Sequence, residues 1–480
     1  MTHRILIAAF CVLAVAGCSR KGPPEGTVAV VGNRWIDTTE LNRSYVLQPL
    51  WKRGQTRLES YLTQVSELIT QKLYAQEAES RGLDRDSLMQ GYLGFIKQKE
   101  MIKGLYRREI REKVQIGDAE VRQMYERMKK KVDFSYVYAR DSARCAEYLG
   151  ALKKAQPPVP GDSSVRFGTK ESATIGMVAP ELEPVVFDGR LNDVQGPIRV
   201  GNGYIAVKIT GGEKQVMLSE NDLLLQRQKI ERLISDRKMD SLSSHYVAGL
   251  MWDKDLRLNG PVFWGVADEF ARRVQEAHVD PQQMQTVYVT SDELRLLGSD
   301  LKMTGNAIVA TYRDGTLTVR ELLEVLSNMP GSLRPRVRTP QNLKDAIGGI
   351  VRNRYLLKEA ERQGLADDPE VLREYAMQRD EALANAYYAS RRGELNVTPE
   401  EVEAFKKRSP VSEEQVFFKM NMSVLARDAK IDSILKSELP ALKTRQEIRC
   451  DTVKIRAMIS SPDEVLRENP VRLFLRELFM

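Results

Sequence analysis

Apolar residues spaced three and four positions apart predict a long helix in the first part of the chain. Its apolar stripe consists of Leu58, Leu62, Val65, Ile69 and Leu73. The helix is expected to end at Gly82, because glycine readily takes the left-handed conformation that closes a helix. Upstream, residues 28–31 and 35–36 predict two short strands, with a turn at Gly32-Asn33. Asp37 to Glu40 then offers a capping oxygen and a carboxylate, so the long helix is expected to begin there.

The same order of elements is predicted again about 282 residues later. The segment KLYAQEAESRGL (72–83) aligns with RYLLKEAERQGL (354–365), and the strand–turn–strand–helix pattern of 28–41 matches that of 307–322. Without a gap, Tyr61, Val65 and Leu68 align with Leu343, Ile347 and Ile350, and Leu73 aligns with Tyr355. Amphipathic helices that end in glycine also resemble one another by chance. However, residues 114–121 and 395–402 match as well, so three successive matches at nearly one offset indicate an internal duplication.

A different pattern separates the two copies. Strands are predicted at 132–138 and 203–209, a helix at 142–154, a loop at 156–164, and a long charged helix at 223–250. Residues 251–304 give no clear pattern. After the second copy, a strand at 417–425 and a helix at 427–442 repeat the strand–helix order of 132–154. These elements predict a mostly helical α+β fold.

Composition narrows the function classes. The chain has 480 residues, of which 42 % are hydrophobic and 29 % charged, and its net charge is +7. After the N-terminus no apolar stretch reaches membrane length. The positive charge is spread among many acidic residues without a basic block, so nucleic acid is not expected as a partner. A mild positive charge suits an anionic membrane surface and an acidic protein client equally well.

Cysteine and histidine usage argues against metal or cofactor chemistry. Beyond the first twenty residues the chain has two histidines, His245 and His278, and no CxxC or HExxH spacing. Cys145 and Cys450 could form a disulfide in an oxidising compartment, and the sequence leaves this open. No phosphate-binding loop occurs either. We therefore expect neither a cofactor nor a bound metal.

The N-terminus sets the expected location of the protein. A short basic start precedes an apolar run, Ile5 to Ala16, that is too short to span a bilayer comfortably. Val15-Ala16-Gly17-Cys18 resembles the bacterial lipobox, which implies a signal peptide at 1–17, a lipidated Cys18 and a tether at 18–27. An ordinary secretory signal or an uncleaved helix is the alternative. The resemblance implies the periplasmic side of a bacterial membrane, and Ser19 favours the outer membrane.

Several segments together point to one family. The helical motifs are LYAQEAESRGL (73–83) and IGDAEVRQMYE (116–126); the others are FSYVYARDSARCAEYLGALKK (134–154), PELEPVVF (180–187) and GPIRVGNGYIAVKI (196–209). Because these motifs occur in this order, the chain resembles the SurA/PrsA family of extracytoplasmic folding factors. In that family a helical chaperone domain carries a parvulin-type (PpiC-like) prolyl isomerase.

The resemblance implies a set of domain boundaries. These are a helical chaperone unit at 28–132, a parvulin-like α/β domain at 133–211, a long helix at 212–250, a connecting region at 251–304, a second chaperone unit at 305–410, and a partial parvulin-like or C-terminal region at 411–480.

The resemblance also implies the position of a catalytic site. A parvulin site sets two histidines beneath an apolar proline pocket. Here Tyr136 lies at the first histidine position and Ile205 at the second, and neither His245 nor His278 falls within 133–211. The pocket-wall positions are Met177, Leu182 and Phe187. Our interpretation is that Met177 and Phe187 are core residues and that the site is degenerate.

Three functions follow as hypotheses. The first is a lipid-anchored periplasmic chaperone that binds unfolded or partly folded envelope and outer-membrane proteins without ATP, its isomerase site lost. The second is an active peptidyl-prolyl cis-trans isomerase of the parvulin family, with Tyr136 or water in place of the histidines. The third is an assembly or scaffold lipoprotein whose degenerate domain only docks partners.

Overall fold

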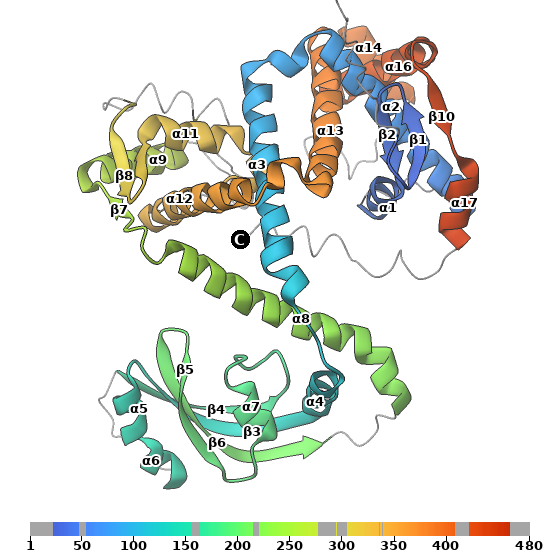
Figure 1. The fold of residues 1–480 in the computed structure, drawn as a ribbon. Helices are drawn as coiled ribbons and strands as arrows, with labels where there is room; N and C mark the ends of the chain where they lie inside the picture. The colour runs from blue at the N-terminus through green and yellow to red at the C-terminus, as the bar shows by residue number, and fades with distance from the viewer. Residues whose placement is uncertain are drawn as a thin grey trace, which may run out of the picture. The chain divides into compact units, whose positions relative to one another are not determined.

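The structure, a computed structural model, divides into two compact units (Figure 1): unit 1 comprises Met1–Leu105 and Asp253–Met480, and unit 2 comprises Tyr106–Trp252. It describes residues 23–47, 54–154, 164–214, 220–276, 294, 305–335, 337, 339–408 and 422–460. Within these residues the fold is mostly helical α+β with small antiparallel sheets, as the sequence pattern predicted. The lipobox residues and His278 lie outside the described part.

The first copy begins unit 1. Its elements are β1 (Thr27–Val31), β2 (Arg34–Asp37), α1 (Thr38–Leu47), α2 (Arg57–Ser80), the short 3-10 helix η1 (Leu83–Arg85) and α3 (Ser87–Glu109). The prediction of one long helix from Asp37 is wrong, because a second start interrupts it. Thr56 caps α2: its side chain accepts from the backbone N–H of Glu59, whose carboxylate in turn accepts from the Thr56 N–H. A capping box of this kind satisfies N–H groups that a helix start leaves free.

The second copy repeats this order. It comprises β8 (Ile308–Tyr312), β9 (Gly315–Thr318), α11 (Val319–Asn328), the 3-10 helix η3 (Gly331–Leu333), α12 (Pro340–Arg362), the 3-10 helix η4 (Leu365–Asp367), α13 (Pro369–Gly393) and α14 (Pro399–Arg408). Thr339 caps α12 as Thr56 caps α2. Gly82 has a φ of +73° and Gly364 a φ of +72°. A glycine in the left-handed conformation therefore follows the long helix of each copy.

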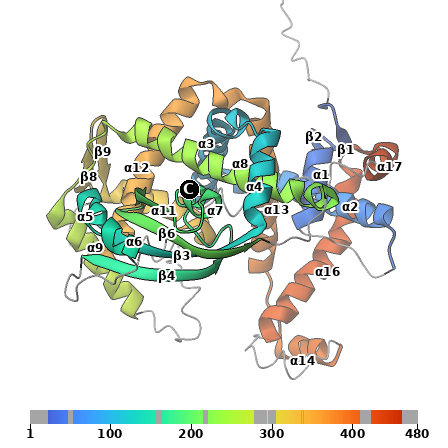
Figure 2. The same ribbon diagram turned by 90° about the horizontal axis from the view of Figure 1, so that it is seen from below.

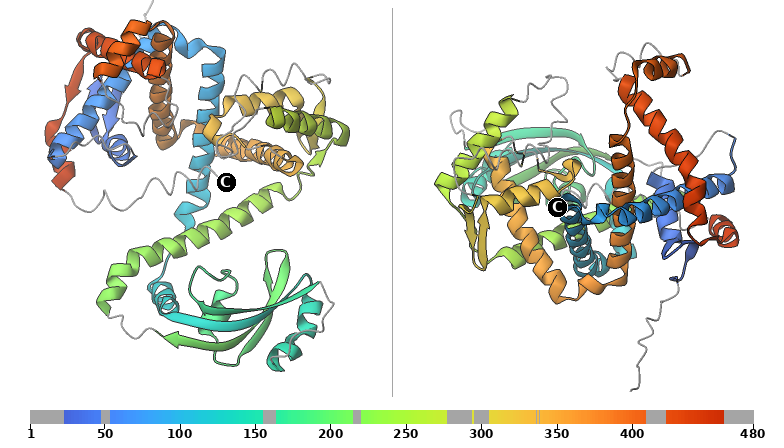
Figure 3. Two further views of the ribbon diagram at one scale, coloured as in Figure 1. Left: turned by 180° about the vertical axis from the view of Figure 1, so that it is seen from behind. Right: turned by 90° about the horizontal axis from the view of Figure 1, so that it is seen from above.

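Buried positions also correspond. Leu73 and Tyr355 are both buried, as the alignment predicted, and so are the three aligned pairs that begin with Tyr61 and Leu343. The first copy's core contains Val28, Val31, Ile36, Tyr61 and Val65, and the second copy's core contains Val309, Leu317, Leu322, Leu343 and Ile347. A third cluster joins the copies: Ala75 and Ala78 of α2 pack against Leu383 and Tyr387 of α13. Figure 3 shows the orange helix α13 crossing the blue helix α2.

The C-terminal part differs from expectation. Residues 422–425 belong to α16 (Met422–Thr444), so the predicted strand at 417–425 is wrong there, and its remainder lies outside the described residues. Ala426, Ile431, Leu435 and Leu442 are buried on α16. That helical spacing overrides a short alternation, which over a few residues does not distinguish strand from helix. β10 (Ile448–Cys450) then pairs with β1, and α17 (Thr452–Ser460) adds Ile455 to the first copy's core.

The connecting region has a matching role. Within 251–304, β7 (Arg257–Leu258) pairs with β8, and α9 (Gly260–Glu276) adds Phe263, Val266 and Phe270 to the second copy's core. Each hairpin in unit 1 therefore becomes a three-stranded sheet, ordered β10-β1-β2 and β7-β8-β9. The described part of 411–480 completes the first sheet, with α16 at the position where the strand–helix order of 132–154 was expected to recur.

Unit 2 is built on a four-stranded antiparallel sheet with the order β4-β3-β6-β5 (Figure 2). Its elements are a short 3-10 helix, η2 (Arg111–Lys113), then α4 (Asp118–Met128), β3 (Lys130–Ala139), α5 (Ser142–Glu147), α6 (Leu149–Lys154), β4 (Val165–Ala173), α7 (Glu183–Asp188), β5 (Val194–Val200), β6 (Gly203–Lys214) and α8 (Glu220–Met251). Alternating residues of β3 and β6 enter two cores, one containing α7 and one containing α5 and α6. Ile230 and Ile234 of α8 pack against α4.

Candidate functional site

Tyr136 and Ile205, which the resemblance aligns with two histidines, lie on one face of the unit 2 sheet. Tyr136 on β3 is the register partner of Gly168 on β4 and of Val207 on β6. A Cβ atom on Gly168 would lie 2.5 Å from Tyr136 Cζ, so the tyrosine ring lies directly over this glycine. Ile205 on β6 is the partner of Ile198 on β5, and Tyr136, Ile198 and Ile205 all border the same apolar core. The two histidine positions thus hold side chains that pack with the sheet.

The three pocket-wall positions do not share one environment. Leu182 and Phe187 are buried in the core beneath α7, with Phe187 only 1 % exposed. The interpretation of Phe187 as a core residue is therefore confirmed. The interpretation of Met177 as a core residue is wrong, because Met177 is 58 % exposed. It lies between β4 and α7, where the chain turns at Gly176 with a φ of +88°, and this turn carries the side chain outward.

Apart from the Tyr136 hydroxyl, this face offers few groups that could transfer a proton. No histidine occurs within 133–211. Glu183 is 1 % exposed, and each of its carboxylate oxygens accepts a hydrogen bond of 2.6 Å from the Arg237 guanidinium of α8. His245 lies on α8, with its Nδ1 2.7 Å from the Ser241 carbonyl oxygen. This arrangement offers a twisting amide apolar contact and little hydrogen-bonding chemistry.

The cysteines give no site either. Cys145 packs in the core on the other face of the sheet, and burial raises the pKa of its thiol. Cys450 is exposed on β10. Both cysteines are free, and they belong to different units. In the described part of the chain, no group of three or more His, Cys, Asp or Glu residues could hold a metal ion, and no helix is long and apolar enough to cross a membrane.

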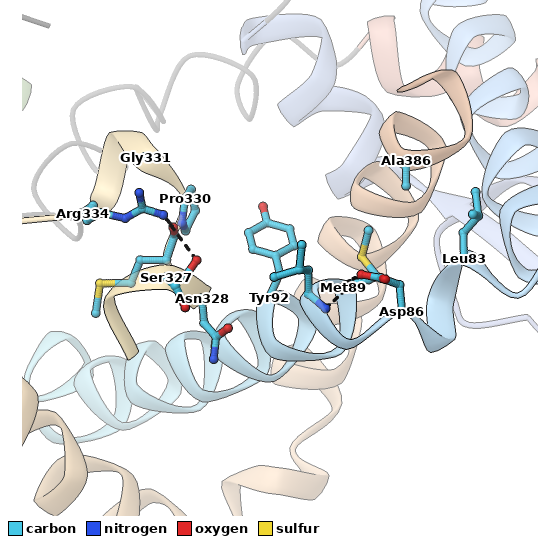
Figure 4. Close-up of a pocket in the computed structure, with 12 residues that line it drawn as sticks. Leu83, Asp86, Met89, Tyr92, Ser327, Asn328, Pro330, Gly331, Arg334 and Ala386 are labelled. Atoms are coloured by element: carbon cyan, nitrogen blue, oxygen red, sulfur yellow. Dashed lines mark hydrogen bonds between the residues drawn. The ribbon is translucent and has the colours of Figure 1, made fainter. Parts of the chain in front are cut away.

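Unit 1 contains a cavity of about 410 Å³ between the two copies (Figure 4). Apolar groups dominate its lining: Leu83, Leu88, Met89, Tyr92, Met329, Pro330 and Ala386. Tyr92 projects from α3 toward the segment that follows α11 (Figure 4). Leu88, which belongs to the lining, is 43 % exposed. A cavity of this size, with apolar walls, is typical of sites that take a few side chains of a ligand.

The two charged side chains in the lining of this cavity are committed to the fold. Arg334 is buried and donates through Nε to the Leu326 carbonyl at 2.8 Å and through Nη2 to the Met329 carbonyl at 2.9 Å. The Asp86 carboxylate accepts from the backbone N–H groups of Leu88 and Met89 and so caps α3. Because both charged groups already have partners and apolar residues dominate the lining, binding in the cavity would rest mainly on apolar contact.

The internal duplication explains why a cavity is present. Gly104 on α3 is so close to the second copy that a Cβ atom there would lie 2.8 Å from Val371 Cγ2, with Leu365 next to it. At the same offset, Ala386 on α13 corresponds to Gly104, and Met89 and Leu83 correspond to Val371 and Leu365. Ala386, Met89 and Leu83 line the cavity. Equivalent helix contacts are therefore tightly packed around Gly104 on α3 and leave a cavity around Ala386 on α13.

A buried charge cluster holds α13 against the first copy. Lys72 Nζ lies 2.8 Å from Glu40 Oε1 and 2.9 Å from Asp380 Oδ2, and Arg34 Nε lies 2.8 Å from Asp380 Oδ1. Burial raises the pKa of Glu40 to about 7, although Lys72 counteracts the shift. Burial alone would lower the pKa of Lys72, but Glu40 and Asp380 outweigh it and raise that pKa. Lys72 is thus a buried cation shared by two carboxylates.

Comparison with known proteins gives partial likeness. No protein-family model matches the chain, and no curated protein matches it. A crystal structure of peptidylprolyl isomerase (PrsA) from Bacillus anthracis shares 14 % identity, covers 38 % of this chain and 96 % of its own, and has a TM-score of 0.18. A crystal structure of peptidylprolyl isomerase (PrsA) from Bacillus cereus shares 12 % identity and has a TM-score of 0.19. The match covers 56 % of this chain and 95 % of the Bacillus cereus chain. At these TM-scores the likeness carries no argument about function.

Sequence reasoning proposed site positions only in unit 2 and missed the cavity in unit 1. Its lining comes from residues 83–92, from 327–334 and from Ala386, which are far apart in sequence and have no common spacing. The alignment of Gly104 with Ala386 was available, but which end of the crossing would remain open depends on packing that a pattern does not contain.

Proposed function

We propose that this protein is a chaperone that holds unfolded or partly folded envelope proteins, anchored by a lipid on Cys18 at the periplasmic side of a bacterial membrane. The observation that carries the proposal is the cavity of about 410 Å³ in unit 1, which has apolar walls and an exposed leucine, Leu88, in its lining. Apolar side chains of a non-native polypeptide would supply most of the binding energy there, at about 25 cal/mol per Å² of apolar surface buried.

The proposal includes the loss of isomerase chemistry in unit 2. The two histidine positions hold Tyr136, which lies over Gly168, and Ile205, which has no polar side-chain atom. The buried carboxylate nearby, Glu183, is neutralised by Arg237. Met177 remains exposed and could contribute apolar contact to a client, so unit 2 would assist binding without catalysing rotation about the prolyl bond.

An aggregation assay tests the proposal. The delipidated protein should suppress aggregation of an unfolded outer-membrane protein, and Leu88→Asp should weaken the suppression several-fold by placing a charge in the lining of the cavity. Ala386→Phe should have the same effect by filling the cavity without a charge. The matched control is Leu191→Asp, which changes a leucine that is 63 % exposed in unit 2. Suppression by both cavity variants at the level of the control, with folding intact, would overturn the proposed site.

The anchor is tested separately. Mass spectrometry of the membrane-extracted protein should show acyl mass on a peptide that begins at Cys18. An unmodified N-terminus upstream of Cys18 would remove the lipid anchor from the proposal and leave the chaperone site to be judged by the aggregation assay alone.

A further inference from the structure

Two short segments of unit 1 have the same construction. We call β7 with α9 (Arg257–Glu276) the first tail, because it follows the first copy, and β10 with α17 (Ile448–Ser460) the second tail. Each tail is a strand of two or three residues that leads directly into a helix. Each strand pairs antiparallel with the first strand of a hairpin, β7 with β8 and β10 with β1.

The backbone contacts of the two tails correspond in detail. The N–H of Asn259 donates to the Val309 carbonyl at 3.0 Å, and the N–H of Asp451 donates to the Val28 carbonyl at 2.8 Å. Both tail residues then start their helices, since the carbonyl of Asn259 accepts from Phe263 and that of Asp451 from Ile455. The registers agree too: Leu258 opposes Ala310, and Cys450 opposes Ala29.

The side chains that anchor each tail also correspond. Phe263 of the first tail is buried in the second copy's core, and Ile455 of the second tail is buried in the first copy's core. Val266 and Met458 occupy the next equivalent position and contact the same two cores. Each tail therefore buries an apolar helix face and covers a strand edge that would otherwise expose free N–H and C=O groups.

The helices before the tails are matched as well. In unit 2, Lys238 of α8 donates to the Gln115 carbonyl and to the Glu120 carboxylate, at 2.6 and 2.8 Å. In unit 1, Lys430 of α16 donates to the Asn396 carbonyl and to Glu401, at 3.1 and 2.7 Å. Gln115 and Glu120 align with Asn396 and Glu401 at an offset of 281, one residue less than that of the long helices. Each copy thus continues through a long helix to its tail, and the four-stranded sheet of unit 2 is an insertion that separates α4 from α8.

The tails are exchanged between the copies. The first tail completes the hairpin of the second copy, and the second tail completes the hairpin of the first. We propose that the edges of β1 and β8 are equivalent docking sites for one kind of partner, a two- to three-residue strand followed by an amphipathic helix, and that either tail fits either site. The chain is then a covalent fusion of two subunits that exchange their tails, and a second copy of this chain carries tails that fit both edges.

A tail transplant in the full chain tests the proposal. Residues 448–459 are replaced by the sequence of 256–267, with the cysteine at position 450 retained, and Ala29→Cys is added opposite it in the register. Oxidation should join positions 29 and 450 at a yield similar to that of the chain with its own tail and Ala29→Cys. The thermal midpoint should fall by no more than about 5 °C, because the anchor and backbone contacts are preserved.

The matched control carries the same twelve residues in reverse order, again with cysteine at position 450. It retains composition and length but misplaces the anchors, so it should cross-link at background yield and lower the midpoint further than the transplant does. If the transplant behaves like the reversed tail in both cross-linking and thermal midpoint, the docking sites are not equivalent and the proposal is wrong.

Discussion

Corresponding ion pairs in the two copies have opposite surroundings. In the first copy Lys72 pairs with Glu40, and their side chains are 2 % and 9 % exposed. In the second copy Arg354 pairs with Glu321, 3.6 Å apart, and these side chains are 29 % and 44 % exposed. Each pair joins the first long helix of its copy, α2 or α12, to the first turn of the preceding helix, α1 or α11. The positions are the same in the duplicated sequence, but their energetic consequences differ.

The difference comes from α13. This helix of the second copy packs along α2 of the first and brings Asp380 to Lys72, which converts a surface ion pair into a buried cluster. A buried ion pair costs desolvation, and it contributes to stability only while every charge keeps its partner. The duplicated sequence therefore forms two similar copies. The packing of α13 against α2 makes the first copy depend on the second.

Removing the cation should give the largest effect. Lys72→Met leaves the carboxyl groups of Glu40 and Asp380 buried without their shared partner, so the free energy of unfolding should fall by about 3–5 kcal/mol. Arg354→Met removes the corresponding cation from a partly solvated site, where the expected loss is about 1 kcal/mol. Urea denaturation of both variants measures the difference. Equal losses would show that α13 does not change the first pair.

Core truncations should affect both copies alike. Leu68→Ala and Ile350→Ala each remove a buried aliphatic side chain at aligned positions. Each should cost about 3 kcal/mol, within the usual range for a core cavity. The same denaturation experiment measures both. A large cost in one copy and a negligible cost in the other would contradict the equivalence of the two cores.

Stability should depend on pH through Glu40. Its pKa is raised to about 7 in the folded protein from 4.5, so between these values the folded state binds more protons than the unfolded state. The free energy of unfolding should therefore decrease as pH rises from 4.5 to 7, by up to about 3 kcal/mol. Glu40→Gln should flatten this decrease. Glu321→Gln is the control, because the pKa of Glu321 is lowered and its contribution changes below pH 4.5.

Helix caps should give the smallest effect, again equal in both copies. The Asp86 side chain accepts from the N–H groups of Leu88 and Met89, and that of Asp368 accepts from Glu370 and Val371. Asp86→Ala and Asp368→Ala should each lower stability by about 1 kcal/mol. Thermal unfolding followed by circular dichroism resolves a loss of this size. A clear difference between the two variants would mean that the helices α3 and α13 do not begin in the same way.

The sequence pattern predicted the duplicated elements, since apolar residues spaced three and four positions apart and the glycines that end the helices are strong local signals. It did not predict the burial of Lys72, because a lysine between helical polar residues normally faces water. The tails were missed as well, since a strand of two or three residues is too short for any periodicity. Met177 was misjudged because its exposure depends on the turn at Gly176. The burial of Lys72 and the pairing of the tails depend on contacts between distant segments.

The proposed function combines client binding in unit 1 with the absence of isomerase chemistry in unit 2. A protease-coupled isomerisation assay on a short prolyl peptide, run on the full delipidated chain, tests this combination most directly. We expect the rate to remain at the uncatalysed value, in which relaxation takes tens to hundreds of seconds. We also expect the same preparation to suppress aggregation of an unfolded outer-membrane protein. Robust turnover that disappears with Tyr136→Phe would contradict the proposal and make unit 2 a prolyl isomerase with a rebuilt site.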